Sequence, residues 1–258
     1  LEFRRVLFRS ETERDLVRSN IGLVFQEITL DDYLTAEENL RFHAVMYGVP
    51  AKEIAPRMDP LLEMVGLSDR RDQEVRFFSG GMKRRLEIAR GLLHMPKVLF
   101  LDEPTIGLDP QTRFHIWDYV DELRRREQTT MFLTTHYMDE AERCHRLAIL
   151  DHGHIAAEGE PKELARDIDA TVIEVECADL VAARRALAGF AAVRSIAQLG
   201  HRLRVLVQRD LADPEPVLAA AVRARCPDAR VERVGASLED VFVAATRLGP
   251  GAAAERAA

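Results

Sequence analysis

The chain of 258 residues carries 36 basic and 43 acidic side chains, which gives a formal net charge of −7. This is an ordinary surface charge for a soluble protein, and we expect no nucleic acid among the partners. No apolar run reaches the ~18–20 residues of a membrane span, so we expect any membrane crossing to be made by another chain. The three cysteines form no C-x-x-C pattern, which favours a reduced protein over a metal site or a disulfide framework.

The first segment, LEFRRVLFRS (1–10), has a basic and apolar character unlike the sequence that follows. It is too short and too charged for a secretory signal. We interpret 1–10 as a non-native or assembly-derived segment joined to a truncated reading frame. The alternative is a native strand of the same domain.

The next part of the chain alternates between predicted strands and helices. IGLVFQ (21–26) predicts a buried strand with Gln26 at its carboxyl end, and Thr35 and Glu38 predict a capping box for the following helix. The remaining elements of this part are expected as a helix over 36–48, helices over 57–65 and 82–94, a strand over 97–101, a helix over 111–126, a strand over 129–135, a short helix over 137–144 and a hairpin about His152 and Gly153. This order predicts an α/β sheet with right-handed crossovers.

A second domain is expected after a change of composition near 165–170. Its predicted elements are a strand over 171–177, a helix over 179–190, strands over 192–198 and 202–208, a helix over 215–226 and a strand over 229–234. The order β-α-β-β-α-β is that of a small α+β ferredoxin-like domain. A last helix is expected over 237–247, and the tail 249–258 is predicted to be disordered.

An acidic pair follows the predicted central strand. Asp102 and Glu103 stand after VLFL, at the strand end where ligands bind in open α/β sheets. Asp102 is suited to hold Mg²⁺, and Glu103 to orient an attacking water. A lone acidic pair is more often a solvated turn, but here two other predicted strands also end in polar residues.

Those two strand ends carry His136 and Gln26. A histidine there can hydrogen-bond a terminal phosphate and its attacking water. A neutral amide can ligate Mg²⁺ or water without adding charge. Taken singly, His136 is weak evidence because a histidine in a loop explains it too, and Gln26 is better explained as a polar strand end.

The stretch SGGMKRR opens a predicted helix. Ser79 is a good N-cap, and Gly80 and Gly81 allow main-chain N–H groups to approach an anion. The helix dipole favours phosphate at this end. The alternative is an ordinary capped helix whose residues Lys83, Arg84 and Arg85 form a solvated face.

In order, Gln26, FSGGM, VLFLDEP, GLD and TTH resemble the motifs of the ATP-binding cassette (ABC) ATPases, over residues 20–165. The resemblance implies an ABC ATPase nucleotide-binding domain related to the P-loop NTPases, with ATP and Mg²⁺ as cofactors. It also assigns roles to nine residues: Gln26 as the Q-loop glutamine, Ser79, Gly80, Gly81 and Met82 as the signature motif, Asp102 as the Walker B aspartate, Glu103 as the catalytic glutamate, Asp109 as the D-loop aspartate and His136 as the switch histidine. Met82 stands where glutamine is commonest in the family.

SLEDVFVAAT (237–246) and the region around the acidic pair resemble the daunorubicin-resistance type of drug exporter, whose ATPases carry an accessory domain after the cassette, here 170–248. The resemblance implies a second ABC ATPase subunit, bound head to tail, and an integral membrane permease as partners. It places the protein in the cytoplasm, at the inner face of the cell membrane. The segment 36–48 corresponds to the region where the family contacts its membrane subunit, although an ordinary amphipathic helix would show the same pattern.

The phosphate-binding pattern G-x-x-x-x-G-K-[ST] does not occur in the sequence. The family places this loop upstream of Gln26, so we expect an N-terminally truncated chain whose intact parent hydrolyses ATP and which is inactive alone. Two other functions are compatible with these motifs: an ABC ATPase that does not act in transport, and a binding or dimerisation module that acts through the C-terminal domain.

Overall fold

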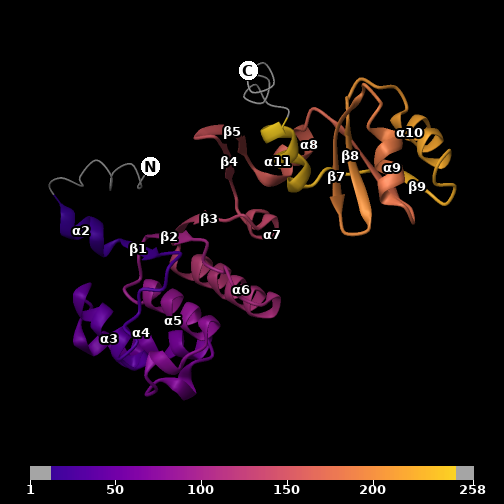
Figure 1. The fold of residues 1–258 in the computed structure, drawn as a ribbon. Helices are drawn as coiled ribbons and strands as arrows, with labels where there is room; N and C mark the ends of the chain where they lie inside the picture. The colour runs from indigo at the N-terminus through magenta and orange to yellow at the C-terminus, as the bar shows by residue number, and fades with distance from the viewer. Residues whose placement is uncertain (1–12, 248–258) are drawn as a thin grey trace. The chain divides into compact units, whose positions relative to one another are not determined.

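The computed structural model describes residues 13–247, which fall into two compact units, the first ending at His136 and the second beginning at Tyr137 (Figure 1). The predicted segment 1–10 and the predicted tail 249–258 lie outside the described residues. The first unit contains an α/β sheet, and the second contains a hairpin and a four-stranded antiparallel sheet.

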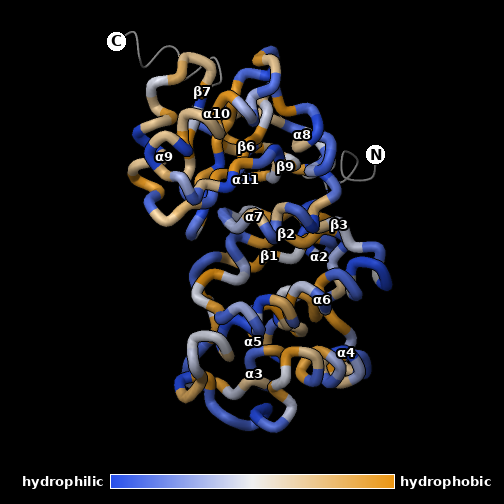
Figure 2. Tube along the Cα trace, turned by 90° about the vertical axis from the view of Figure 1, so that its right-hand side faces the viewer, coloured by the Kyte–Doolittle hydropathy of each residue, from blue (hydrophilic) through white to orange (hydrophobic). Residues whose placement is uncertain are grey.

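The first unit is built on a parallel sheet in the order β1-β2-β3. The strands are β1 (Ile21–Val24), β2 (Val98–Asp102) and β3 (Thr130–Thr134). Val24 pairs with Leu101, and Asp102 pairs with Thr134, so the carboxyl ends of all three strands meet at one edge. The apolar run of β2 is visible as a hydrophobic stretch in Figure 2 and has the composition of a central parallel strand. The strand predicted over 21–26 ends at Val24, so Gln26 lies in the loop that follows it.

Helices and two short 3-10 turns complete this unit. They are α2 (Arg14–Ser19), α3 (Ala36–Met46), α4 (Ala51–Met64), η1 (Ser68–Arg70), η2 (Val75–Phe77), α5 (Gly80–Leu92) and α6 (Pro110–Glu127). The capping box predicted for α3 is present, because Thr35 accepts a hydrogen bond from the Glu38 N–H and the Glu38 carboxylate accepts one from the Thr35 N–H. The helix predicted over 57–65 begins six residues earlier, at Ala51, because it accommodates Pro56 and Pro60 within its length.

The second unit begins with α7 (Met138–Ala141) and a hairpin of β4 (Leu147–Asp151) and β5 (His154–Gly159). The turn between these strands holds His152 and Gly153, both at positive φ, as the sequence predicts for a tight hairpin. The hairpin and α8 (Pro161–Asp167) contact the last helix, α11 (Leu238–Arg247). Residues 137–167 therefore belong to the second compact unit. That unit begins well before the change of composition near 165–170.

The four-stranded sheet has the order β7-β8-β6-β9 and is antiparallel throughout. Its elements are β6 (Thr171–Glu176), α9 (Leu180–Leu187), β7 (Val193–Leu199), β8 (Arg202–Val207), α10 (Pro214–Arg223) and β9 (Arg230–Val234). One face of this sheet is apolar and packs against α9 and α10. The buried core between them includes Ile173 of β6, Leu187 of α9 and Leu218 of α10. The sequence predicts the same order of elements, with ends that differ by at most three residues.

Candidate functional site

The tip of β2 is tied to the tip of β3. The Thr134 hydroxyl donates a hydrogen bond to the Asp102 carboxylate, and the Glu103 N–H donates to the Thr134 carbonyl oxygen at 3.0 Å. Glu103 has φ +44°, a left-handed conformation that is uncommon for a residue with a side chain. Since such a conformation is costly, it persists only where surrounding contacts enforce it, and it is most frequent at functional sites.

Glu103 and His136 come together at this edge. His136 Nδ1 lies 3.2 Å from Glu103 Oε1, and the two side chains are 53% and 27% exposed respectively. Both groups are therefore accessible to water and to a ligand while they contact each other. A carboxylate that orients water beside an imidazole that can donate a hydrogen bond is an arrangement suited to hydrolysis.

Gln26 follows β1 at the same edge, and its side chain is exposed. Its carbonyl oxygen accepts a hydrogen bond from Arg84 Nη1 at 3.4 Å, and the carbonyl oxygen of Asp102 accepts one from Arg84 Nη2 at 3.1 Å. The loops after β1 and β2 are thus held by one side chain. Gln26, Asp102, Glu103 and His136 belong to one cluster of loops at the carboxyl ends of the three strands.

The residues predicted as the signature motif form the start of α5. Ser79 is the N-cap, and its hydroxyl accepts a hydrogen bond from the Met82 N–H at 3.2 Å. Gly80 is exposed and Gly81 is half-buried, and no neighbouring atom lies within 4 Å of the Cβ position of Gly80. A large group can therefore approach the main-chain N–H groups at this helix end closely.

Asp109 is the N-cap of α6. Its carboxylate accepts a hydrogen bond from the Thr112 N–H at 2.9 Å. Hydrogen bonds from the side chain and then from the main chain of Thr112 lower the pKa of Asp109. Asp109 is therefore held as a carboxylate at the exposed start of α6.

Arg84 is a site residue that the sequence interpretation missed. Rather than contributing to a solvated face, it is 2% exposed and donates to main-chain carbonyls of both strand-tip loops. The helical spacing contained the signal, because Arg84 shares a face of α5 with the buried residues Glu87, Ile88 and Gly91.

An exposed apolar surface lies on α3 and the loop before it. Its exposed members are Tyr33, Phe42, Val45 and Met46. A groove of about 260 Å³ adjoins it, lined in part by Phe25, Phe42 and Met46. We call this the α3 surface. Surfaces of this kind commonly mark interaction sites.

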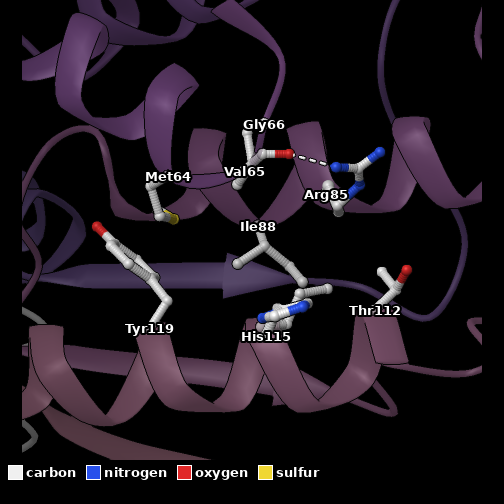
Figure 3. Close-up of a pocket in the computed structure, with 9 residues that line it drawn as sticks. Met64, Val65, Gly66, Arg85, Ile88, Thr112, His115 and Tyr119 are labelled. Atoms are coloured by element: carbon white, nitrogen blue, oxygen red, sulfur yellow. Dashed lines mark hydrogen bonds between the residues drawn. The ribbon is translucent and has the colours of Figure 1, made fainter. Parts of the chain in front are cut away.

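A second cavity, of about 210 Å³, lies between the end of α4, α5 and α6 (Figure 3). Met64, Ile88 and Tyr119 give it an apolar lining, and Arg85 at its rim donates to the Val65 carbonyl oxygen at 2.6 Å. None of the nine residues predicted for the site lines this cavity.

Within residues 13–247, no helix is long and apolar enough to cross a bilayer. No group of three or more His, Cys, Asp or Glu side chains in the same range could hold a metal ion by itself.

The comparisons with known proteins agree with this geometry. The protein family described as "ABC transporter" matches residues 4–106. The chain is 41% identical over 236 residues to "Nod factor export ATP-binding protein I" of Ralstonia nicotianae, with 89% of this chain and 71% of that protein covered. It is 37% identical over 209 residues to "Linearmycin resistance ATP-binding protein LnrL" of Bacillus subtilis, with 79% and 65% covered.

Solved structures show the same likeness. One described as "Structure of ATP binding subunit of ABC transporter" has a TM-score of 0.56 at 30% identity, and the match covers 61% of this chain and 65% of that chain. The ADP- and phosphate-bound dimer of the ATP-binding cassette MJ0796 has a TM-score of 0.52 at 28% identity, with 57% and 65% covered. The matched region is thus just under two thirds of each solved chain.

The parallel sheet with its acidic strand tip and the glycine-rich start of α5 defines a cassette-type ATPase fold. The chain belongs to the family of ABC transporter ATP-binding subunits.

Proposed function

We propose that this chain is an ATP-binding and ATP-hydrolysing subunit of an ABC transporter that energises export of a drug or other hydrophobic compound through a separate membrane permease. The contact of Glu103 with His136, beside Asp102 at the edge of the sheet, carries the proposal. Relatives named for Nod factor export and linearmycin resistance support outward transport.

Each strand-tip residue has a proposed role in hydrolysis. Glu103 orients and polarises the water that attacks the terminal phosphate, and His136 donates a hydrogen bond that keeps Glu103 and the phosphate in place. Asp102 and the Gln26 side-chain oxygen are hard oxygen ligands of the kind that Mg²⁺ prefers. Mg²⁺, when bound with ATP, neutralises charge on the phosphate oxygens.

The start of α5 is proposed to act on a second ABC ATPase subunit. Ser79, Gly80, Gly81 and Met82 would clamp the ATP that this subunit holds in a head-to-tail dimer, with Asp109 close to the dimer contact. The open Cβ position at Gly80 supports close approach of the phosphates. Since the sequence contains no phosphate-binding pattern, we propose that the chain does not turn over ATP by itself.

The α3 surface supports a transport role over an ABC ATPase that does not act in transport. Tyr33, Phe42, Val45 and Met46 are exposed together, and a membrane-subunit helix docked there would lie beside Phe25, the neighbour of Gln26. Docking would place the subunit in the cytoplasm, at the inner face of the membrane.

The sheet of the second unit is proposed to be a ferredoxin-like accessory domain. The strand order β7-β8-β6-β9 and the position of α9 and α10 on one apolar face support this class.

The test measures ATP turnover by the chain alone and by a version extended at its N-terminus with the phosphate-binding segment of a relative. In the extended chain the phosphate-binding loop and Glu103 belong to the same site. We expect turnover only by the extended chain, and its loss when the extended chain carries Glu103→Gln. Turnover by the chain alone above that of its Glu103→Gln variant would contradict the proposal.

A further inference from the structure

Arg84 binds both of the loops that carry the proposed site. Its guanidinium donates to five main-chain carbonyl oxygens, and three of them follow β2: Asp102 at 3.1 Å, Glu103 at 2.9 Å and Pro104 at 2.5 Å. The other two follow β1 and belong to Phe25 and to Gln26, the latter at 3.4 Å. The side chain lies at the boundary of these loops and is 2% exposed.

The number of bonds uses the full donor capacity of the side chain. Arginine carries five N–H donors in a rigid planar fork. Nε donates to Pro104, Nη1 donates to the two oxygens after β1, and Nη2 donates to those of Asp102 and Glu103. A shift of either loop by itself would therefore break bonds that the fork cannot replace elsewhere.

The charge of Arg84 is compensated in an unusual way. Its hydrogen-bond partners are carbonyl dipoles, whereas its neighbour Lys83 pairs with the Asp32 carboxylate at 2.6 Å. Burial lowers the pKa of the Arg84 guanidinium, and the charges of Glu87 and Asp102 oppose that effect. Burying a charge costs free energy, so a buried arginine contributes little to stability by itself. The five bonds of Arg84 to main-chain carbonyls indicate instead that it holds specific backbone positions.

We infer that Arg84 is a positioning residue, which fixes the loops carrying Gln26 and Glu103 to the helix that begins with Ser79. The inference rests on the proposed function, because it concerns the same site. Arg84 stands five positions after Ser79, about 7.5 Å further along the helix axis. A displacement of the start of α5, where the second subunit's ATP is proposed to bind, is therefore passed to both loops together.

The first test uses the chain itself and needs no nucleotide. Loss of a hydrogen bond moves a main-chain carbonyl ¹³C resonance upfield, so the five acceptor carbonyls report directly on Arg84. In Arg84→Met we expect upfield shifts at Phe25, Gln26, Asp102, Glu103 and Pro104. In Arg84→Lys, which keeps the charge but has a single nitrogen, we expect shifts in at least one of the two loops.

Arg85→Lys is the matched control, because Arg85 is the next residue of α5 and donates to the Val65 carbonyl instead. It should shift the Val65 resonance and leave the five acceptors unchanged. If Arg84→Lys and Arg84→Met leave the five acceptors in their wild-type positions, Arg84 positions nothing. If resonances shift equally throughout the first unit, Arg84 is a general structural support. Either result overturns the inference, and Arg84→Lys decides it should Arg84→Met not fold.

The second test measures ATP turnover by the chain extended with the phosphate-binding segment. We expect Arg84→Lys to lower kcat roughly 10- to 100-fold, the effect of a small misplacement of catalytic groups, with the KM for ATP within about twofold. A higher KM with normal kcat would contradict a positioning role. If the extended chain without substitutions gives no turnover, the proposed function fails, while the carbonyl resonances still decide the inference.

Discussion

Gly22 of β1 and Gly91 of α5 approach each other so closely that a Cβ atom on Gly22 would lie 2.6 Å from the Gly91 carbonyl oxygen. A Cβ on Gly91 would lie 2.7 Å from Val24 Cγ2. The two glycines thus set the distance between the first strand and the helix that carries Ser79 and Arg84. The edge strand and α5 can bring their site residues together only because neither position has a side chain.

Gly22→Ala should therefore destabilise the protein, by about 1–3 kcal/mol, the usual effect of overpacking a core. The Gly91 carbonyl belongs to a helix backbone and has little freedom to move away. Urea unfolding measures the change in the free energy of unfolding. Gly189→Ala is the control, because no atom lies within 4 Å of its Cβ position and its φ is not positive. Equal free energies for the wild type and Gly22→Ala would show that β1 and α5 are not in this close contact.

Glu103→Gln should abolish turnover by the chain extended with the phosphate-binding segment while leaving the fold intact. The amide keeps the size of the side chain and its reach to His136, but it is a poor base for the attacking water. Loss of general-base action lowers rates by about 10²–10⁴-fold. The measurement is kcat together with binding of an ATP analogue, and binding should be retained. A kcat within a few fold of the wild-type value would exclude Glu103 from the chemistry.

Glu103→Gly separates the strain at this position from its chemistry. Glycine adopts φ +44° without penalty, so Glu103→Gly should raise the free energy of unfolding by up to about 1 kcal/mol relative to Glu103→Gln, as a less strained residue. Both variants should be equally inactive. A Glu103→Gly variant that is less stable than Glu103→Gln would show that the loop is not strained at this residue.

Acid should destabilise the first unit through His43. Burial is the main cause that lowers the pKa of His43 to about 3, and the charges of Arg90 and His94 add to it. In the unfolded chain the imidazole has the ordinary pKa of about 6.5. The unfolded state therefore binds more protons as the pH falls below about 6.5, and stability is lost from there down to about pH 3, by at most about 1.4 kcal/mol per pH unit.

His43→Phe tests this pH dependence. The ring stacks on Tyr47 with centroids 4.3 Å apart, and His43 Nε2 is buried without a hydrogen-bond partner, so a phenyl ring fits the local chemistry. We expect a flatter profile of unfolding free energy between pH 6.5 and pH 4 than in the wild type. His154→Ala, at an exposed position, should keep the wild-type slope. An unchanged slope in His43→Phe would assign the acid sensitivity to other groups, such as His94.

The sequence was sufficient for the elements whose signal is local. The capping box of Thr35 and Glu38 and the hairpin turn at His152 and Gly153 depend on neighbours in the chain, and each is found as predicted. The role of Arg84 was not predicted, because its five acceptors lie 58 to 59 residues away on one side and 18 to 20 residues away on the other. Gln26 was placed at the end of a strand that in fact stops at Val24, since an apolar run does not show where pairing with β2 ends.

The contact between Glu103 and His136 could be predicted from the sequence only in part. Each residue follows a predicted strand, so the shared edge of the sheet follows from the sequence. Their 3.2 Å separation does not, because it depends on the left-handed conformation of Glu103 and on the Thr134 bonds. The assigned roles of the nine site residues remain predictions.

In the second unit, we expect substitution of Arg204 to lower the free energy of unfolding more than substitution of any other ion-paired residue. Its guanidinium donates to both carboxylate oxygens of Asp240, at 3.1 and 2.6 Å, and thereby fixes α11 to β8. Asp240 also accepts the N–H of Ser237 at 2.8 Å, so the same carboxylate holds the start of the helix. Arg204→Met leaves Asp240 buried without its cation, while Glu174 keeps its ion pair with Arg202, and should cost about 3–5 kcal/mol.

The matched control is Arg230→Met, whose ion pair with Glu232 is exposed and 3.8 Å long. Exposed pairs contribute little, so it should change the free energy of unfolding by less than about 1 kcal/mol. Adding Asp240→Asn to Arg204→Met should recover part of the loss, because it removes the uncompensated charge. If Arg204→Met and Arg230→Met lower stability equally, the Arg204–Asp240 pair is not the link that holds α11 on the sheet. The first unit should melt as in the wild type in every one of these variants.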